Sequence, residues 1–249
     1  MTDDALVRGG AGSGPSNTLW QLTAYATVAG RQRSDHVRTL MTARIATAAD
    51  EQVVVDIFVR SFFNDPLWGW VFTDPSTRAE RQHVIWQLCF EGAQRYPWTF
   101  LSENGTSAAM WIPPNGTEFD AEQEQRMEHA MSELFGEDVG RVNGTFELFD
   151  AHHPRHVPHF YLSLLGTHPD HLGHGFGLSL LAENLAAIDE TGAPAYLEAS
   201  HMGNVPIYQR YGFEPVVAFN GPSGGPTVTA MWRIGRSGIE WTDRSLQGE

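Results

Sequence analysis

Residues 159–181 read His159-Phe-Tyr-Leu-Ser-Leu-Leu-Gly-Thr-His168-Pro-Asp-His-Leu-Gly173-His-Gly175-Phe-Gly177-Leu-Ser-Leu-Leu181. The segment begins as an apolar, aromatic-rich run that suits a buried strand, and Pro169 ends that run. Three glycines then alternate with other residues, and leucines recur at helical spacing after them. Because the amides and dipole of a helix start attract negative charge, and glycine lets a phosphate approach the main chain, the segment predicts an anion site. A tight turn without a ligand stays open as the alternative.

The composition is that of a folded, acidic protein. The 249 residues fit one large domain or two small ones, 41% of them are hydrophobic, and the formal net charge is −14. Such a charge argues against nucleic acid or an anionic membrane as partner and suits a cationic partner. The single Cys89 excludes a disulfide within the chain. The apolar runs are too short to span a bilayer and the first residues lack the basic region of a secretory signal, so we expect a soluble, cytoplasmic protein.

The chain divides by composition into an extension, a folded body and a tail. Residues 1–40 include the linker-like run Gly9-Gly-Ala-Gly-Ser-Gly-Pro15 and are expected to be flexible or loosely docked. Residues 41–236 carry the strand and helix patterns and are predicted to form one domain. Residues 237–249 are polar and are predicted to form a C-terminal tail.

Strand and helix patterns alternate along the body. Strands are predicted over 42–46, 98–101, 107–112, 159–167, 195–200, 213–219 and 227–234, and helices over 47–62, 76–95, 178–191 and 205–210. The aromatic run 67–72 is expected to be a loop or a short helical turn. Asn104-Gly105 signals a hairpin between the second and third strands. The alternation predicts a mixed α/β or α+β sheet.

Residues 118–150 form an acidic segment, with ten Asp or Glu residues against two Arg. Met127, Ala130, Met131 and Leu134 recur at helical spacing, so the acids are expected on the opposite face of a helix. The favoured interpretation is a solvated helix face and a core methionine stripe. The alternative is that the acids attract a cationic substrate.

The spacing of the glycines separates several phosphate-binding motifs. A Rossmann turn would read Gly-x-Gly-x-x-Gly early in a domain, and a Walker loop would need a lysine, which this chain lacks. Thr167-His-Pro-Asp-His-Leu-Gly-His-Gly-Phe-Gly177 instead resembles the acetyl-coenzyme A signature of the GNAT superfamily of N-acetyltransferases. Asn204-Val-Pro-Ile-Tyr-Gln-Arg-Tyr-Gly-Phe213 resembles that family's second motif, in the same order and at a matching distance. The resemblance is sharpest over 159–219, and the layout, acidic insert included, is most similar to the puromycin N-acetyltransferase-like branch.

The resemblance implies a fold and a cosubstrate. The fold is α/β (α+β): a mixed, mostly antiparallel central sheet of six to seven strands, with a splayed central strand pair and helices on both faces. The cosubstrate is acetyl-coenzyme A (acetyl-CoA), with no metal. Leu172 stands where the signature usually has Arg or Gln, so phosphate binding would rest on backbone amides, the helix dipole and a protonated His174. The implied cofactor-binding residues are Leu165, Gly166, Thr167, Leu172, Gly173, His174, Gly175, Phe176, Gly177 and Asn204.

Two side chains match the family's catalytic positions. An amine with a pKa of about 10 must lose a proton before it attacks, and the departing thiolate leaves more easily if it is protonated. Glu198 matches the strand glutamate that serves several relatives as base, and a buried structural carboxylate is the alternative. Tyr208 matches the usual general acid, and a packed aromatic that lines the cofactor site is the alternative. Turn formation would explain Asn204 as well as a place beside the cofactor does.

Two other clusters could belong to a site. The first is His152, His153, His156 and His159, which suggest a metal; the prolines between them and the lack of a completing ligand argue against it. The second is the aromatic group Phe62, Phe63, Trp68, Trp70 and Phe72, which lies where relatives place the acceptor pocket. A plain core is the favoured interpretation, although aromatics facing acids would suit a cationic, partly apolar amine.

The sequence therefore predicts an acetyl-CoA-dependent N-acetyltransferase. The expected acceptor is the primary amine of a small or peptide-like, cationic molecule, such as an antibiotic or another secondary metabolite. The alternatives are acetylation of a protein N-terminus or side chain, and a catalytically weak acyl-CoA-binding module. A monomer or a homodimer is compatible with the pattern.

Overall fold

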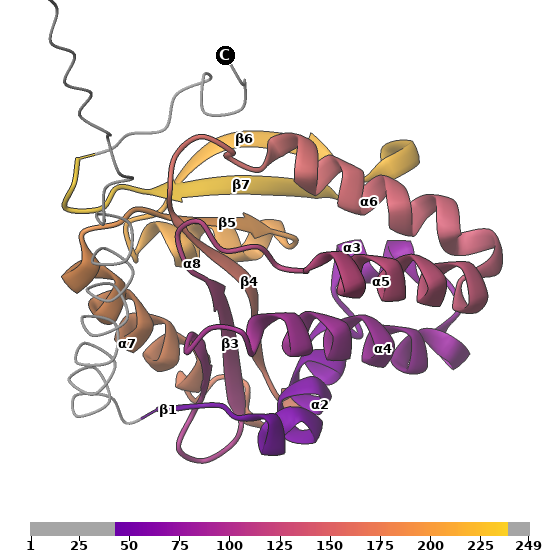
Figure 1. Cartoon of the computed structure of the whole chain (residues 1–249), viewed down its shortest axis with the longest axis horizontal. Helices are drawn as coiled ribbons and strands as arrows, with labels where there is room; N and C mark the ends of the chain where they lie inside the picture. The colour runs from indigo at the N-terminus through magenta and orange to yellow at the C-terminus, as the bar shows by residue number, and fades with distance from the viewer. Residues whose placement is uncertain (1–42, 239–249) are drawn as a thin grey trace, which may run out of the picture. The chain divides into compact units, whose positions relative to one another are not determined.

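The computed structural model describes residues 43–238, which build one seven-stranded sheet in the order β1-β2-β3-β4-β5-β7-β6 (Figure 1). Every neighbouring pair is antiparallel except β4 and β5, which are parallel. The predicted mixed, mostly antiparallel sheet is therefore confirmed. The strands are β1 (Arg44–Ile45), β2 (Thr99–Leu101), β3 (Ser107–Ile112), β4 (Phe160–Thr167), β5 (Ala195–Ala199), β6 (Glu214–Asn220) and β7 (Thr227–Arg233).

Helices cover both faces of the sheet, as predicted. α2 (Glu51–Phe62) and α4 (Pro75–Ala93) pack on one face, whereas α7 (Phe176–Thr191) packs on the other (Figure 1). Strand alternation feeds the two cores: Met110 belongs to the core under α2 and α4, and Trp111 to the core under α7. Trp111 Nε1 also donates to Asn184 Oδ1 at 2.9 Å, which ties β3 to α7.

The remaining helices stack beyond α4. The run 67–72 is mostly helical, because Pro66 starts α3 (Pro66–Val71) and the Asp65 carboxylate caps it by accepting from the Leu67 and Trp68 amides. The acidic segment folds as two helices, α5 (Ala121–Leu134) and α6 (Val139–His152), joined by the 3-10 turn η2 (Gly136–Asp138). α5 packs on α4, and α6 contacts both α5 and α3 (Figure 1).

Short turns complete the order of elements. They are η1 (Ala48–Asp50), η3 (Pro169–His171), η4 (Met202–Asn204), α8 (Val205–Gln209) and η5 (Pro222–Gly224). No helix within residues 43–238 combines the length and apolar character needed to cross a bilayer. The expectations for residues 1–40, and for the tail from residue 239 on, lie outside the described part of the chain.

A β-bulge in β4 opens the middle of the sheet. Trp111 of β3 pairs with Leu162, whereas the adjacent Met110 pairs with Leu164, so Ser163 is an extra residue in β4. Bulges bend a strand and increase its twist. The pairing of β4 with β5 stops at the same place, with Leu162 opposite Leu197. The predicted splayed central pair is therefore present, and the bulge accounts for it.

Candidate active site

The gap between β4 and β5 is a slot that collects several of the predicted residues. It forms a cavity of about 70 Å³. Leu165 lines it from β4 and Glu198 from β5, while Asn204 and Tyr208 line it from η4 and α8. The end of β4 and the segment that starts at Glu198, 33 residues after Leu165, thus meet where the two strands separate beyond the bulge.

The glycine turn leads from the end of β4 into α7. Gly173 and Gly175 have φ values of 80° and 79°, in the left-handed region that favours glycine, and nothing lies within 4 Å of a Cβ built on either. Gly175 is the N-cap of α7, and no side chain caps the helix. The first amides of α7 and an open space beside them therefore fit an anionic group, as the sequence predicts.

Two side chains of the turn depart from the family pattern, and both are at the surface. Leu172 is 63% exposed, an unusual environment for a large apolar side chain. The His174 ring stacks on Phe176, with 5.7 Å between ring centroids, and its Nδ1 lies 3.1 Å from the Leu172 carbonyl oxygen. The turn thus presents apolar and imidazole surface next to its free amides.

The end of β4 packs closely against α2 and against the start of α7. A Cβ on Gly166 would lie 2.7 Å from Ser61 Oγ of α2, and a Cβ on Gly177 would lie 2.4 Å from Thr167 Oγ1. Ser61 Oγ donates to the Thr167 carbonyl at 2.8 Å. Because β4 and the start of α7 touch with no room for a methyl group, the slot and the glycine turn have one fixed spacing.

Glu198 is a buried carboxyl group at the slot. Its side chain is 3% exposed. Burial is the main reason that its pKa rises to about 8, and the negative charge of Glu118 adds to the rise. Hydrogen bonds from Tyr196 and Tyr161 oppose part of that shift. A carboxyl group with such a pKa can take up a proton near neutral pH, which is the property a general base requires.

Tyr208 is a partly buried phenol that lines the same slot. Burial raises its pKa to about 12, and the negative charge of Asp65 contributes. Asp65 Oδ2 accepts a hydrogen bond from Ser200 Oγ at 2.7 Å, which joins the start of α3 to the end of β5. The phenol stays protonated and can therefore only donate its proton.

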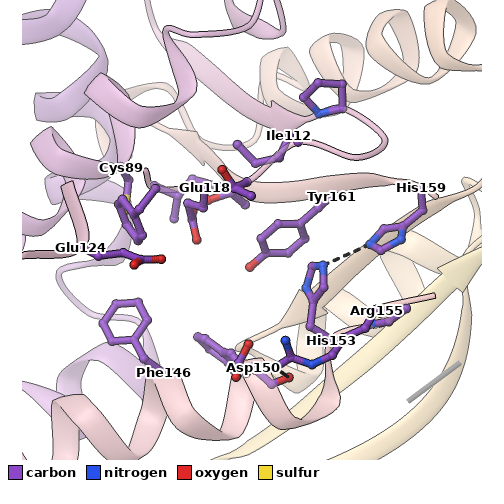
Figure 2. A pocket seen from close by; sticks show the side chains of 18 of the residues that line it. Cys89, Ile112, Glu118, Glu124, Phe146, Asp150, His153, Arg155, His159 and Tyr161 are labelled. Carbon is purple, nitrogen blue, oxygen red and sulfur yellow. Dashed lines mark hydrogen bonds and ion pairs between the residues drawn. The ribbon is translucent and has the colours of Figure 1, made fainter. Parts of the chain in front are cut away.

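A larger cavity, of about 720 Å³, adjoins the slot through Tyr161, Ser163 and Leu164, which line both. Figure 2 shows Glu118, Tyr161 and His153 pointing into it from the loop after β3, from β4 and from the end of α6. Glu118 is partly buried, loss of solvent raises its pKa, and it accepts a hydrogen bond from Ser163 Oγ. Burial is the main reason that the pKa of the Tyr161 phenol is raised, and the charges of Glu198 and Glu118 add to the rise.

The walls of this cavity are aromatic and acidic. Trp68, Trp86, Phe119, Phe146 and Phe149 supply aromatic surface, while Glu118, Glu124, Glu128 and Asp150 supply carboxylates. Arg155 compensates one of these, since it lies 2.5 Å from Asp150. Part of the acidic segment thus lines a cavity, and the rest lies outside it. Met127 and Met131 belong to the core and also line the cavity.

The members of the aromatic group and of the histidine cluster do not all lie at one place in the structure. Of the aromatic group, Phe62 and Trp68 line the slot, whereas Phe72 is buried in the core. His153 and His159 contact each other, with 3.2 Å between their Nε2 atoms. Within residues 43–238, no group of three or more His, Cys, Asp or Glu side chains is placed to hold a metal ion.

Several residues of the site escape sequence reasoning. Tyr161 and Ser163 are missed because the bulge interrupts the period of two along β4: Tyr161 packs on the core under α2 and α4, whereas Leu165 packs on the core under α7. Glu118 gives no such signal, because it is one acid among ten in its segment. Only the fold distinguishes it from the others.

Comparison with known proteins bears directly on this site. Residues 103–216, which contain the slot and the glycine turn, match the family model described as "Acetyltransferase (GNAT) domain". This region is therefore similar to a GNAT acetyltransferase domain. A solved structure from Corynebacterium glutamicum, described as histone acetyltransferase HPA2 and related acetyltransferase, is similar to the chain at 25% identity and a TM-score of 0.58. The match covers 78% of this chain and 96% of that one.

A second solved structure is similar to this chain in its fold alone. Mosquito arylalkylamine N-acetyltransferase like 5b matches at 10% identity and a TM-score of 0.51, over 77% of this chain and 98% of that one. The family model and the first neighbour place the protein among the acetyl-CoA-dependent N-acetyltransferases.

Proposed function

We propose that the protein transfers the acetyl group of acetyl-CoA to the primary amine of a small or peptide-like, cationic molecule. The observation that carries this proposal is the acidic, aromatic cavity of about 720 Å³ that meets the β4–β5 slot at Tyr161. Carboxylates and aromatic faces attract a cation that also has apolar surface. An antibiotic or another secondary metabolite has this chemistry, and the likeness to the puromycin N-acetyltransferase-like branch supports that choice.

The proposed cofactor residues follow from the geometry of the turn and the slot. The open space beside Gly173 and Gly175 and the uncapped start of α7 suit the pyrophosphate of coenzyme A. The β4 main chain at Leu165, Gly166 and Thr167 no longer pairs with β5, so it is free to bind the pantetheine arm. Leu172, His174, Phe176, Gly177 and Asn204 would complete the site, with Leu172 offering apolar contact where relatives have a polar side chain.

The proposed reaction uses one proton acceptor and one proton donor. The ionised Glu198 takes a proton from the ammonium group, directly or through water, and leaves a neutral amine. The amine nitrogen then forms a bond to the thioester carbonyl carbon, and the carbon–sulfur bond breaks. Tyr208 donates its proton to the departing sulfur, which leaves as the thiol. The nitrogen releases its second proton as the amide forms, and this proton restores the Tyr208 phenol through solvent. Because the pKa of Glu198 is raised to about 8, kcat/KM should rise with pH up to that value.

Thiol release from acetyl-CoA with a panel of amines tests the proposal. The panel should contain aminonucleoside and aminoglycoside antibiotics, aliphatic diamines and a lysine-containing peptide, because the peptide tests the protein-acetylation alternative. We expect release with a small cationic amine. Measurable acetyl-CoA binding without release for any amine would contradict the proposal and indicate an acyl-CoA-binding module.

The glutamate variant tests the mechanism. We expect Glu198→Gln to lower kcat/KM by about 100-fold, the usual contribution of a general base. The matched control is Glu133→Gln, a change of the same chemistry at an exposed position of α5, which should leave kcat/KM unchanged. Equal turnover of Glu198→Gln and the unmodified protein at every pH would remove Glu198 from the mechanism.

A further inference from the structure

One oxygen of the proposed base has no hydrogen-bond partner. Among residues 43–238, nothing donates a hydrogen bond to Glu198 Oε1, although the atom is buried. The group that faces it is the His153 ring at the end of α6, with Nδ1 at 4.0 Å from Oε1. Because an unpartnered buried oxygen is costly, the protonation of the His153 ring decides what this contact contributes.

A chain of contacts fixes which nitrogen of His153 carries the proton. His159 Nδ1 lies 2.6 Å from the Val157 carbonyl oxygen, which can only accept, so Nδ1 of His159 carries a proton. His159 Nε2 is then an acceptor, and His153 Nε2 at 3.2 Å must be the donor to it. Burial lowers the pKa of both rings, that of His153 to about 3, and so favours the neutral form of each. His153 Nδ1 therefore carries a lone pair.

A lone pair on His153 Nδ1 thus lies 4.0 Å from a lone pair on Glu198 Oε1, which is longer than a hydrogen bond. A small rotation of either side chain would bring a proton on Oε1 within reach of Nδ1. We propose that His153 accepts a hydrogen bond from the protonated carboxyl group of Glu198, and so stabilises the form that Glu198 takes after it has deprotonated the amine. His153 is a positioning residue in this scheme. The proposal rests on the proposed role of Glu198 as base.

The other groups around Glu198 act differently from His153. Tyr196 on β5 and Tyr161 on β4 lower the pKa of the carboxyl group and so favour its ionised form, although the Tyr196 hydroxyl also donates to the His152 carbonyl oxygen at 3.1 Å. Glu118, from the loop after β3, contributes negative charge. The neutral imidazole of His153 is the nitrogen acceptor beside Oε1.

The test is the pKa of Glu198 in a His153→Phe variant, followed by infrared titration of the carboxyl band and assigned with Glu198→Gln. Phenylalanine keeps the site buried and removes the acceptor, so we expect the pKa to fall by about one unit from its value of about 8. The ionised fraction at pH 7 would then rise from roughly one tenth to roughly one half. An unchanged pKa, or a raised one, would overturn the proposal.

The matched control is His156→Phe. His156 lines the same cavity from the same segment but is exposed, and its substitution should leave the pKa of Glu198 where it is. A second measurement needs no variant: ring nitrogen NMR shifts of the unmodified protein should report a neutral His153 with its proton on Nε2. A proton on Nδ1 would contradict the proposal. Neither measurement depends on turnover, so failure of the base role in Glu198→Gln kinetics and failure of this contact are separate results.

Discussion

Tyr208 shows how loss of solvent can suit a side chain to donate a proton. Because the pKa of this phenol is raised to about 12, it stays protonated throughout the pH range in which the protein can be assayed. Such a group is suited to donate to a thiolate that develops next to it. Its neighbour Tyr211 is a useful contrast, since the Tyr211 hydroxyl donates to the Leu178 carbonyl at 3.2 Å, and this residue does not line the slot.

We expect Tyr208→Phe to lower kcat by about 100-fold, in line with general-acid catalysis, with little change in the KM for acetyl-CoA. Tyr211→Phe is the matched control and should keep kcat within about threefold, since it loses one hydrogen bond outside the slot. Steady-state kinetics of both variants decide the matter. Full turnover by Tyr208→Phe would leave this residue as a packed aromatic of the cofactor site.

The contact between the start of α7 and the end of β4 is the element-scale feature that sets the cofactor turn. An alanine at Gly177 would place its Cβ 2.4 Å from Thr167 Oγ1, an atom that also lies 3.0 Å from Ser107 Oγ. Either Thr167 rotates and loses that hydrogen bond, or α7 moves away from β4. We expect Gly177→Ala to reduce the free energy of unfolding by about 1–3 kcal/mol and to raise the KM for acetyl-CoA several-fold.

Urea unfolding and initial-rate kinetics check this prediction. Gly140→Ala is the control: Gly140 lies in α6 with open space around it and should stabilise the protein by about 0.5–1 kcal/mol through helix propensity. Adding Thr167→Ala to Gly177→Ala should recover most of the loss, as a double-mutant cycle measures. Additive effects of the two substitutions would show that the close approach is unimportant.

Elements with strong local signals could be predicted from the sequence. Asn104-Gly105 located the hairpin, and Gly192, with φ of 77°, ends α7 where the pattern ends. The bulge at Ser163 could not be predicted, because an extra residue in a strand leaves no mark in an apolar run. The glycine turn, Glu198 and Tyr208 were found through motif resemblance, and the structure places Glu198 and Tyr208 at one slot, with the turn after the end of β4. Glu118 was missed, and His153 was considered only as a metal ligand, because only the folded chain brings them to Tyr161 and Glu198.

At the scale of the whole molecule, the buried Glu198 and the partly buried His153 give opposite dependences of stability on pH. Glu198 has an ordinary pKa of 4.5 and a folded value of about 8, so between these values only the folded protein holds the proton. The free energy of unfolding therefore falls as pH rises through this window, by up to about 1.4 kcal/mol per unit. His153 acts in the other direction: its folded pKa of about 3 lies below 6.5, so stability is lost as pH falls between these values.

We expect Glu198→Gln to be more stable than the unmodified protein at about pH 8.5, and the gain to shrink towards about pH 5, where the folded carboxyl group is neutral. Urea unfolding at the two pH values measures the difference. Glu133→Gln, on the exposed face of α5, should show no gain at either pH. A gain of equal size at both pH values would point to packing rather than to the buried charge.

The bulge at Ser163 makes the location of the slot depend on the number of residues in β4. Substitutions along β4 change what lines the opening, but the parting of β4 from β5 after Leu162 depends on one surplus residue relative to β3. Before it, Leu162 faces the core under α7; after it, Leu164 faces the core under α2, so the bulge exchanges the faces of the alternate positions. Deletion of one residue from β4 should therefore disturb the slot more than substitution of a side chain that lines it.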